Sequence, residues 1–404
     1  MVVSRRAANG APSSAFIGAV RAAIALLSAL LTGVLAAIGV ASLVAARRVV
    51  TPAARVPDTR ILDLDTAAQT ITLSRTPDTE LPGRYGLFTS GTSPYLKLGS
   101  VLAEDAGSVK RKLLTHVADS ARLSSEAAFS GWYYGGPAEL QLAYHDVTVR
   151  TALGPAPAWL FAGGDHADTW VVQVHGRGTT RAECLRAVPL FDALGFTSLV
   201  VSYRNDTEAP RTRTGTYTLG ATEWRDVDAA VDYARTHGAR RVVLMGWSMG
   251  GAIVLQTALE TRHPELIAGV VLESPVIDWR IVLDYQARLN RLPHAVTGLA
   301  IGALGSDWAA PVTRGAIPFD RLDVVARAGE LQHPVLILHS DDDGFVPSDA
   351  SHALASARPD LVELRVFDTA RHTKLWNYDQ ERWSDSIRAW LRRTGISAPA
   401  DADS

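Results

Sequence analysis

Cysteine is almost missing from this chain: Cys184 is the only one in 404 residues. One cysteine cannot form an intramolecular disulfide, and it cannot supply the thiolates of a structural zinc site. Cys184 lies in an expected helix after Thr180, so we predict a buried structural thiol and not a nucleophile. The redox compartment stays open, because one cysteine suits either side of a membrane.

A strong net charge is also lacking. The chain has 40 basic and 42 acidic residues, a net charge of −2, and it shows no basic stripe with interleaved aromatics. These features exclude nucleic acid as a partner. Gly250-Gly251 is not followed by lysine, so there is no Walker-type phosphate loop, and no metal-ligand cluster is visible. We therefore expect neither a cofactor nor a metal.

What the chain does have is a long apolar run. Residues 22–46 contain no charge and lie between Arg21 and Arg47-Arg48. This length exceeds the roughly 20 residues that cross a bilayer. We predict a disordered segment at 1–21, a transmembrane helix at 22–46 that places the chain in a lipid bilayer, and a linker at 47–60. A cleaved signal peptide, ending near Val44-Ala45-Ala46, is the alternative.

The orientation of the span is nearly balanced by charge, since three arginines precede it and four follow closely. A single N-terminal span before a large domain usually acts as a signal anchor. We therefore expect a single-pass protein of the cell membrane with an extracytoplasmic catalytic domain.

Residues 61–140 show short alternating stretches divided by proline and glycine, which indicates a small β-rich module. From 141 to 395, apolar strand patterns alternate with helical ones, which predicts a mostly parallel sheet with helices on both faces. Residues 275–332 interrupt this alternation and are expected to form an inserted helical cap. Residues 396–404 are expected to be a disordered tail.

The cap contains large apolar residues that could face a cleft. For most of them, packing inside the cap is the expected role. They are Trp279, Tyr285, Leu289, Leu299 and Trp308.

The central motif is Gly246-Trp247-Ser248-Met249-Gly250, between a strand pattern and a helix pattern. This is a G-x-S-x-G motif in the strand–turn–helix setting that exposes a serine hydroxyl above a sheet. A chance serine in a small-residue turn is the alternative, so the surrounding residues must decide.

A nucleophilic serine needs a base, and the base needs an orienting acid. The expected order in this architecture is serine, acid, histidine, each after a strand. Asp343 follows the apolar run 335–338 and is our candidate acid, ahead of Asp342 and then Asp341. His372 follows the last strand pattern and is the candidate base.

A glycine-rich turn, His175-Gly176-Arg177-Gly178, follows the strand that ends at Val174. Such a turn can aim a backbone amide at a developing oxyanion. We expect the amides of Arg177 and Met249 to form the oxyanion hole, and His175 to brace the loop.

Together these ordered motifs resemble the α/β-hydrolase superfamily over about residues 140–395, most closely the serine-aminopeptidase-like (S33-type) and membrane-anchored bacterial hydrolases. The resemblance implies an eight-stranded core, an α/β-hydrolase fold with an inserted cap, and the triad Ser248, Asp343 and His372. Ser340 stands where the family pattern usually has glycine.

The expected function is hydrolysis of a carboxylic ester through an acyl-enzyme on Ser248. A peptidase or aminopeptidase acting on a peptide remains open, and it would need acidic residues for the substrate ammonium; neither Glu126 nor Glu139 is assigned to that role. An acyltransferase with the same triad is also open. A non-catalytic, membrane-tethered binding module is the alternative from another class.

Overall fold

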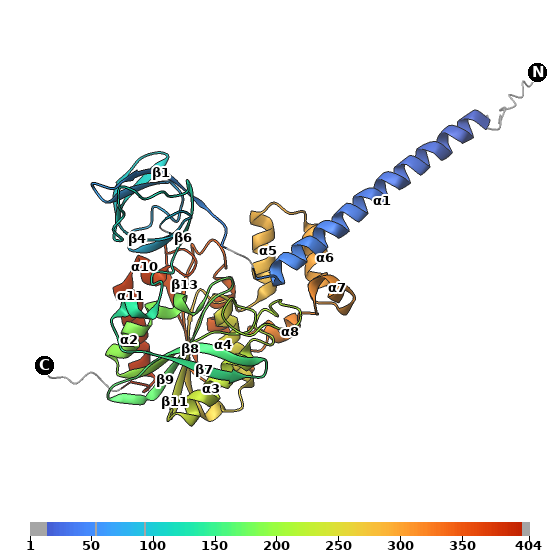
Figure 1. Ribbon diagram of the computed structural model, residues 1–404. Coiled ribbons are helices and arrows are strands. Elements are labelled where there is room, and N and C mark those ends of the chain that lie inside the picture. The colour runs from blue at the N-terminus through green and yellow to red at the C-terminus, as the bar shows by residue number, and fades with distance from the viewer. Residues whose placement is uncertain (1–13, 53–54, 93, 398–404) are drawn as a thin grey trace, which may run out of the picture.

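The structure is a computed structural model that describes residues 14–52, 55–92 and 94–397. In these residues the chain forms a long N-terminal helix, a small β-barrel, and a main domain built on a central sheet (Figure 1). The barrel and the helix both lie on the side of the main domain that carries the cap and the segment near α10.

Helix α1 (Ser14–Val50) begins and ends outside the predicted span of 22–46. The expectation of disorder for 14–21 and of a linker for 47–50 was wrong, whereas residues 1–13 lie outside the described residues. The helix continues because no proline occurs between Ser14 and Pro52, and Arg47 and Arg48 in its last turn complement the helix dipole. Within the described chain, it is the one helix long and apolar enough to cross a membrane, a test that a signal sequence would also pass.

The predicted β-rich module is a closed antiparallel barrel with strand order β1-β2-β5-β4-β3-β6 in the described part of the chain. Closure removes the unpaired strand edges that a small sheet would otherwise expose. Its strands are β1 (Thr59–Asp65), β2 (Thr70–Ser74), β3 (Tyr85–Phe88), β4 (Tyr95–Glu104), β5 (Ser108–Leu113) and β6 (Glu126–Ser130).

The main domain contains an eight-stranded sheet among the described residues, in the order β14-β13-β12-β11-β9-β10-β8-β7. The five pairings from β10 through β9 to β14 are parallel, while β8 and β7 form an antiparallel edge. Its strands are β7 (His145–Thr151), β8 (Gly154–Phe161), β9 (His166–Val174), β10 (Phe196–Val201), β11 (Arg241–Trp247), β12 (Ile267–Glu273), β13 (Val335–Ser340) and β14 (Val362–Phe367).

Helices cover both faces of this sheet, as the alternating pattern predicted. On β11, Val242 and Leu244 belong to one buried core, and Val243 and Met245 belong to the other. Successive side chains of a strand point to opposite faces, so a continuous apolar run suits a strand buried on both sides. The covering helices are α2 (Val188–Ala193), α3 (Trp224–Thr236), α4 (Met249–Glu260), α9 (Asp349–Ala357) and α11 (Gln380–Arg393), with the short α10 (Leu375–Tyr378).

The predicted insertion between β12 and β13 is present as a set of short helices. They are α5 (Trp279–Leu289), α6 (His294–Leu304), α7 (Ala310–Thr313) and α8 (Phe319–Leu322). Helix α6 packs along the C-terminal part of α1, and α7 also contacts α1. At the other end, Ile396 is buried against the main core, so the predicted tail does not begin at 396; residues 398–404 lie outside the described residues.

Candidate active site

Ser248 occupies the sharp turn between β11 and α4, with backbone angles φ 52° and ψ −118°. A non-glycine residue with positive φ is strained, and such strain is characteristic of functional turns. The neighbouring glycines are required by close packing. A Cβ at Gly246 would lie 2.4 Å from the Gly250 carbonyl oxygen, and one at Gly250 would lie 2.2 Å from the Val174 carbonyl oxygen. The motif is therefore fixed by the geometry of the turn.

The structure brings Ser248, His372 and Asp343 together from three separate loops. The Ser248 Oγ is 3.0 Å from His372 Nε2, and His372 Nδ1 is 2.9 Å from the Asp343 carboxylate. An ionised carboxylate can only accept a hydrogen bond, so Nδ1 carries the proton and Nε2 is left to accept from the serine hydroxyl. This is the arrangement of a serine nucleophile, its base and an orienting acid.

Asp343 is buried and accepts the backbone N–H groups of Phe345 and Val346. Burial alone would raise the pKa of this carboxyl group. The charge and hydrogen bonds of His372 and His339 outweigh burial and hold the pKa of Asp343 well below its ordinary value. The carboxylate therefore stays ionised throughout the neutral range.

The other two aspartates of the same loop have different partners. Asp341 accepts hydrogen bonds from Ser348 and His352, and Asp342 forms an ion pair with Arg371 at 2.8 Å. Among the three aspartates ranked from the sequence, only Asp343 contacts the His372 ring in the described structure.

The expected oxyanion loop lies against the serine. A Cβ on Gly176 would be 3.3 Å from the Ser248 Cβ, so this loop and the nucleophile are in direct proximity. Met249 is the first residue of α4, where amides have no acceptor inside the helix. Within the described chain, neither the Arg177 amide nor the Met249 amide donates a hydrogen bond to another residue. Both amides are therefore available to a substrate oxygen.

Two acidic residues that the sequence analysis did not single out brace this loop. His175 Nε2 is 3.0 Å from Asp206, and its ring stacks on Tyr203 with centroids 4.3 Å apart. Glu183 accepts the Gly176 amide at 2.8 Å. The bracing role expected for His175 is confirmed. Asp206 and Glu183 carry no local sequence signal, since their partners are set by tertiary packing.

The Arg177 side chain connects the same loop to the end of α1. Its Nε donates to the Val49 carbonyl at 3.0 Å, and its Nη2 donates to the carbonyls of Arg48 and Thr51 at 2.7 and 2.8 Å. The last carbonyls of a helix have no partner within the helix, so a guanidinium is a suitable donor for them. The last turn of α1 is thus part of the site's architecture.

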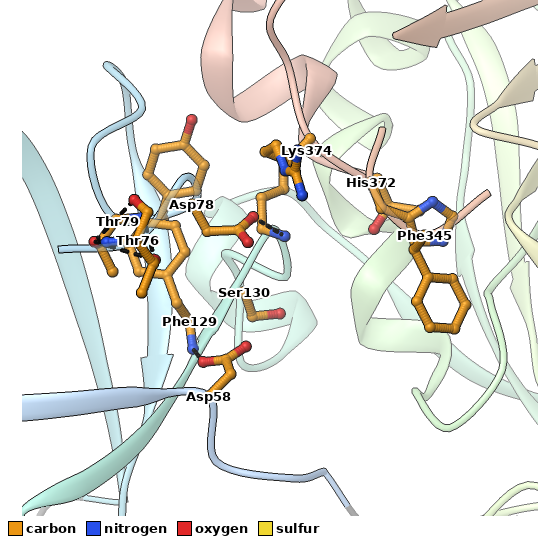
Figure 2. A network of polar contacts seen from close by, with 12 residues as sticks. Asp58, Thr76, Asp78, Thr79, Phe129, Ser130, Phe345, His372 and Lys374 are labelled. Carbon is orange, nitrogen blue, oxygen red and sulfur yellow. Dashed lines mark hydrogen bonds and ion pairs between the residues drawn. The ribbon is translucent and has the colours of Figure 1, made fainter. Parts of the chain in front are cut away.

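The barrel contacts the segment that follows His372. Lys374 pairs with Asp78 at 2.9 Å, and Figure 2 shows this pair beside His372 and Phe345. The Arg84 amide donates to the Asn377 carbonyl. At Gly131 the contact is so close that a Cβ would lie 2.4 Å from the Thr373 carbonyl oxygen. The barrel therefore holds the residues immediately after the candidate base.

Glu273, at the end of β12, is a further buried residue that sequence reasoning missed. Its Oε2 accepts the indole N–H groups of Trp247 and Trp383 at 2.9 and 2.8 Å, and its Oε1 accepts the Leu375 amide. Burial raises the pKa of Glu273, against the charge of Arg186 and these hydrogen bonds. The sequence does contain a signal for this residue, because Glu273 ends an apolar strand pattern in Leu272-Glu273-Ser274-Pro275.

The cap residues differ from the expectation. Trp279 is buried and its indole donates to the Leu219 carbonyl, as packing predicted. Leu289, Leu299 and Trp308 are exposed by 54, 51 and 68%, so the expectation of cap packing was wrong for them. An apolar residue in a helix pattern looks like core from sequence, whether or not a partner covers it.

Neither glutamate considered for a substrate ammonium meets that need. Glu139 is paired with Lys97, and Glu126 is an exposed residue of barrel strand β6. For metals, residues 14–52, 55–92 and 94–397 contain no group of three or more His, Cys, Asp or Glu side chains placed to hold an ion. Cys184 is buried, as predicted.

Comparison with known proteins agrees with the architecture. The sequence profile of the α/β hydrolase fold family matches residues 169–300. A solved esterase from Pyrococcus furiosus superposes with a TM-score of 0.52 at 19% identity, over 64% of this chain and 94% of that one. The chain has the α/β-hydrolase fold. Ahead of this hydrolase domain, a domain of unknown function (DUF8805) matches residues 60–130, the barrel.

Two curated proteins are similar to parts of the chain. A pimeloyl-[acyl-carrier protein] methyl ester esterase from Chromobacterium violaceum is 26% identical over 191 residues, which are 39% of this chain and 72% of the esterase. Ethanol acetyltransferase 1 from Wickerhamomyces ciferrii is 33% identical over 79 residues, 19% of this chain. The match spans only a fifth of the length of that acetyltransferase.

Proposed function

We propose that this α/β-hydrolase is a membrane-anchored serine hydrolase that cleaves a carboxylic ester. The observation that carries the proposal is the hydrogen-bonded series from the Ser248 Oγ through His372 to Asp343, with contacts of 3.0 and 2.9 Å. The strained backbone at Ser248 supports it, as do the amides of Arg177 and Met249, which have no acceptor among the described residues. The esterase from Chromobacterium violaceum acts, by its name, on a methyl ester.

The reaction follows from the geometry. His372 Nε2 accepts the proton of Ser248 as Oγ bonds to the ester carbonyl carbon, and the amides of Arg177 and Met249 hold the resulting oxyanion. His372 then gives this proton to the departing alkoxide, which leaves as an alcohol. Water attacks the acyl-enzyme with His372 as base, and the acid is released as Ser248 regains its proton. Asp343 keeps the ring oriented and stabilises its charged form.

The test uses short-chain aryl esters and a serine-directed phosphonate. Ser248→Ala is expected to lower kcat by about 10⁴-fold or more and to abolish labelling. Ser386→Ala is the control, since the exposed Ser386 hydroxyl donates to the Arg382 carbonyl within α11 and contacts none of the three residues of the series among the described contacts. Full activity and unchanged labelling in Ser248→Ala would overturn the proposal. An unaltered chain that neither cleaves these esters nor takes the label would favour the non-catalytic binding module.

An acyltransferase is the second candidate. It is favoured by the match to an acetyltransferase, because the same acyl-enzyme can pass its acyl group to an alcohol instead of water. Adding ethanol to the ester assay and measuring the new ester against free acid separates the two. A peptidase of the S33 type has less support, since neither glutamate considered for an ammonium is available.

The membrane anchor belongs to the same proposal. Ser42 and Ala46 of α1 are buried. Cleavage near Ala46 would remove buried parts of the domain, which supports an uncleaved anchor over a signal peptide. We place the hydrolase domain outside the cytoplasm. Phosphonate labelling of intact cells tests this, because labelling that requires permeabilisation would put the domain inside.

A further inference from the structure

We propose that the outer face of cap helix α6 lies in the bilayer surface, and that the hydrolase takes esters whose acyl chain is held in the membrane. This inference rests on the proposed ester hydrolysis and names the substrate class of the same site. It is argued from the burial along α1, from the composition of α6, and from the contacts between the cap and the triad.

The depth of the cap follows from α1. Arg21 marks the N-terminal limit of the apolar part of the helix. About 20 residues at 1.5 Å each are needed to cross the hydrocarbon. The span therefore extends to about Ala41. Burial against the protein begins earlier, at Ile38, and Ser42 is fully covered. The protein thus meets α1 within the last turn of the span, at the boundary of the hydrocarbon.

The cap helix that packs most extensively along α1 is α6, whose 11 residues include no charged side chain, His294 aside. Its inner face is buried through Val296, Thr297, Ala300, Ala303 and Leu304. A surface helix normally turns a polar face to water, and a helix that is apolar all round is normally covered. The outer face of α6 is apolar as well: Ala295, Gly298, Leu299 and Gly302 are exposed.

The residues flanking α6 suit a membrane interface. Leu292 before it and Trp308 after it are exposed by 40 and 68%, and Arg291 and Arg314 are exposed near them. Aromatic and basic side chains gather at the headgroup level of bilayers, where a polar tip meets water and an apolar part meets lipid. We call Leu292, Leu299 and Trp308 the membrane face.

The same cap reaches the candidate base through Phe345. Gln286 of α5 donates to the Phe345 carbonyl at 2.7 Å, and the Phe345 ring packs against His372 with centroids 5.0 Å apart. From the other side, Arg177 joins the expected oxyanion loop to the end of α1. The candidate site thus lies between the cap and the end of α1, which are the two elements that we place at the bilayer. This position suits an amphiphilic ester that enters the site from the membrane.

The depth of the face can be measured with the full chain in vesicles of phosphatidylcholine and phosphatidylglycerol. A nitroxide on Leu299→Cys should collide with oxygen, which concentrates in lipid, more than with a water-soluble nickel complex. Leu102→Cys in barrel strand β4 is the control, because Leu102 is exposed by 52%. The native Cys184 is buried, and burial raises the pKa of its thiol, so it will not take the label. Equal access of the nickel complex to both labels would overturn the proposal.

Activity tests the substrate class. Leu299→Glu should lower turnover of nitrophenyl palmitate dissolved in the vesicles by about fivefold or more, since interfacial binding scales with buried apolar area. Turnover of soluble nitrophenyl acetate should not change, and Leu102→Glu should affect neither ester. Equal loss on both esters, or no loss on either, would contradict the proposal.

Two other results point elsewhere. A disulfide-linked dimer of Leu299→Cys without lipid contact would assign the face to a second copy of the chain and overturn the membrane assignment. If the unaltered chain cleaves neither ester, the proposed hydrolysis fails, whereas the nitroxide depth still reports separately on the membrane face.

Discussion

Helix α1 and the barrel both reach the candidate site, but they do so by different kinds of contact. The backbone carbonyls at the end of helix α1 accept hydrogen bonds from Arg177, and small side chains of the helix such as Ser42 and Ala46 are buried. The barrel region uses a polar contact at Asp78 and close backbone approaches at Gly83 and Gly131. Helix α1 contacts the loop of Arg177, and the barrel contacts the segment after His372. Each half of the candidate site therefore contacts a different part of the N-terminal region.

The largest effect is expected on the helix side. Arg177→Ala removes the three guanidinium bonds to the end of α1 and frees the loop that carries the oxyanion amide. Loss of one such donor typically costs about 10² in kcat, and we expect a fall of this size with little change in KM. Arg48→Ala is the control, because only the Arg48 carbonyl is used. If both variants keep full kcat, the helix end does not position the loop.

A smaller effect is expected on the barrel side. Gly131→Ala places a Cβ against the Thr373 carbonyl and should displace the residue next to His372, with about a 10-fold loss of kcat. Gly107→Ala is matched to it, since a Cβ on Gly107 meets nothing within 4 Å. Stopped-flow ester hydrolysis compares the two. Equal rates for the two variants would show that the barrel does not position the segment that carries His372.

The ion pair between barrel and loop should matter less. Asp78→Ala and Lys374→Ala are each expected to slow kcat about 2- to 5-fold, with a coupling of about 0.5–1 kcal/mol in the double mutant. The exposed pair Arg388–Asp385 serves as a control, for which we expect no effect on kcat. If the effects of the two substitutions on kcat are additive, the ion pair between Lys374 and Asp78 does not contribute to kcat.

The smallest effect concerns Glu273, which contacts both sides through Trp247 and Leu375. Its pKa is raised in the folded state, so the folded protein binds more protons there than the unfolded chain does. The free energy of unfolding therefore falls as pH rises from the ordinary carboxyl pKa through the raised one. Glu273→Gln should remove this part of the fall in urea titrations from pH 4 upward. An unchanged pH slope would mean that Glu273 titrates normally.

The three candidate residues could be predicted because each has a recognisable position in the sequence, directly after a strand pattern. Ser248, Asp343 and His372 each follow an apolar strand, and parallel strands bring their carboxyl ends to one edge. The acid could be ranked among three aspartates but not fixed, since Asp341, Asp342 and Asp343 differ only in their tertiary partners.

The attachments could not be predicted, because their contacts join distant parts of the chain without a local pattern. Arg177 meets Val49 from 128 positions away, and nothing in the sequence of either residue indicates the other. The exposure of Leu299 was missed for a related reason. Periodicity shows which residues share a helix face, but not whether a partner covers that face.

The hold of Arg177 on the end of α1 also bears on how the enzyme is made. Synthesis proceeds from the N-terminus, so the carbonyls of Arg48 and Val49 leave the ribosome long before Arg177 does. Until then the helix end has no guanidinium donor, and the oxyanion loop has no anchor. A shortened soluble version that begins after Pro52 would keep its triad residues but leave Arg177 permanently without those carbonyls. Rates measured on such a version would therefore describe a site in which this loop lacks its contacts with the end of α1.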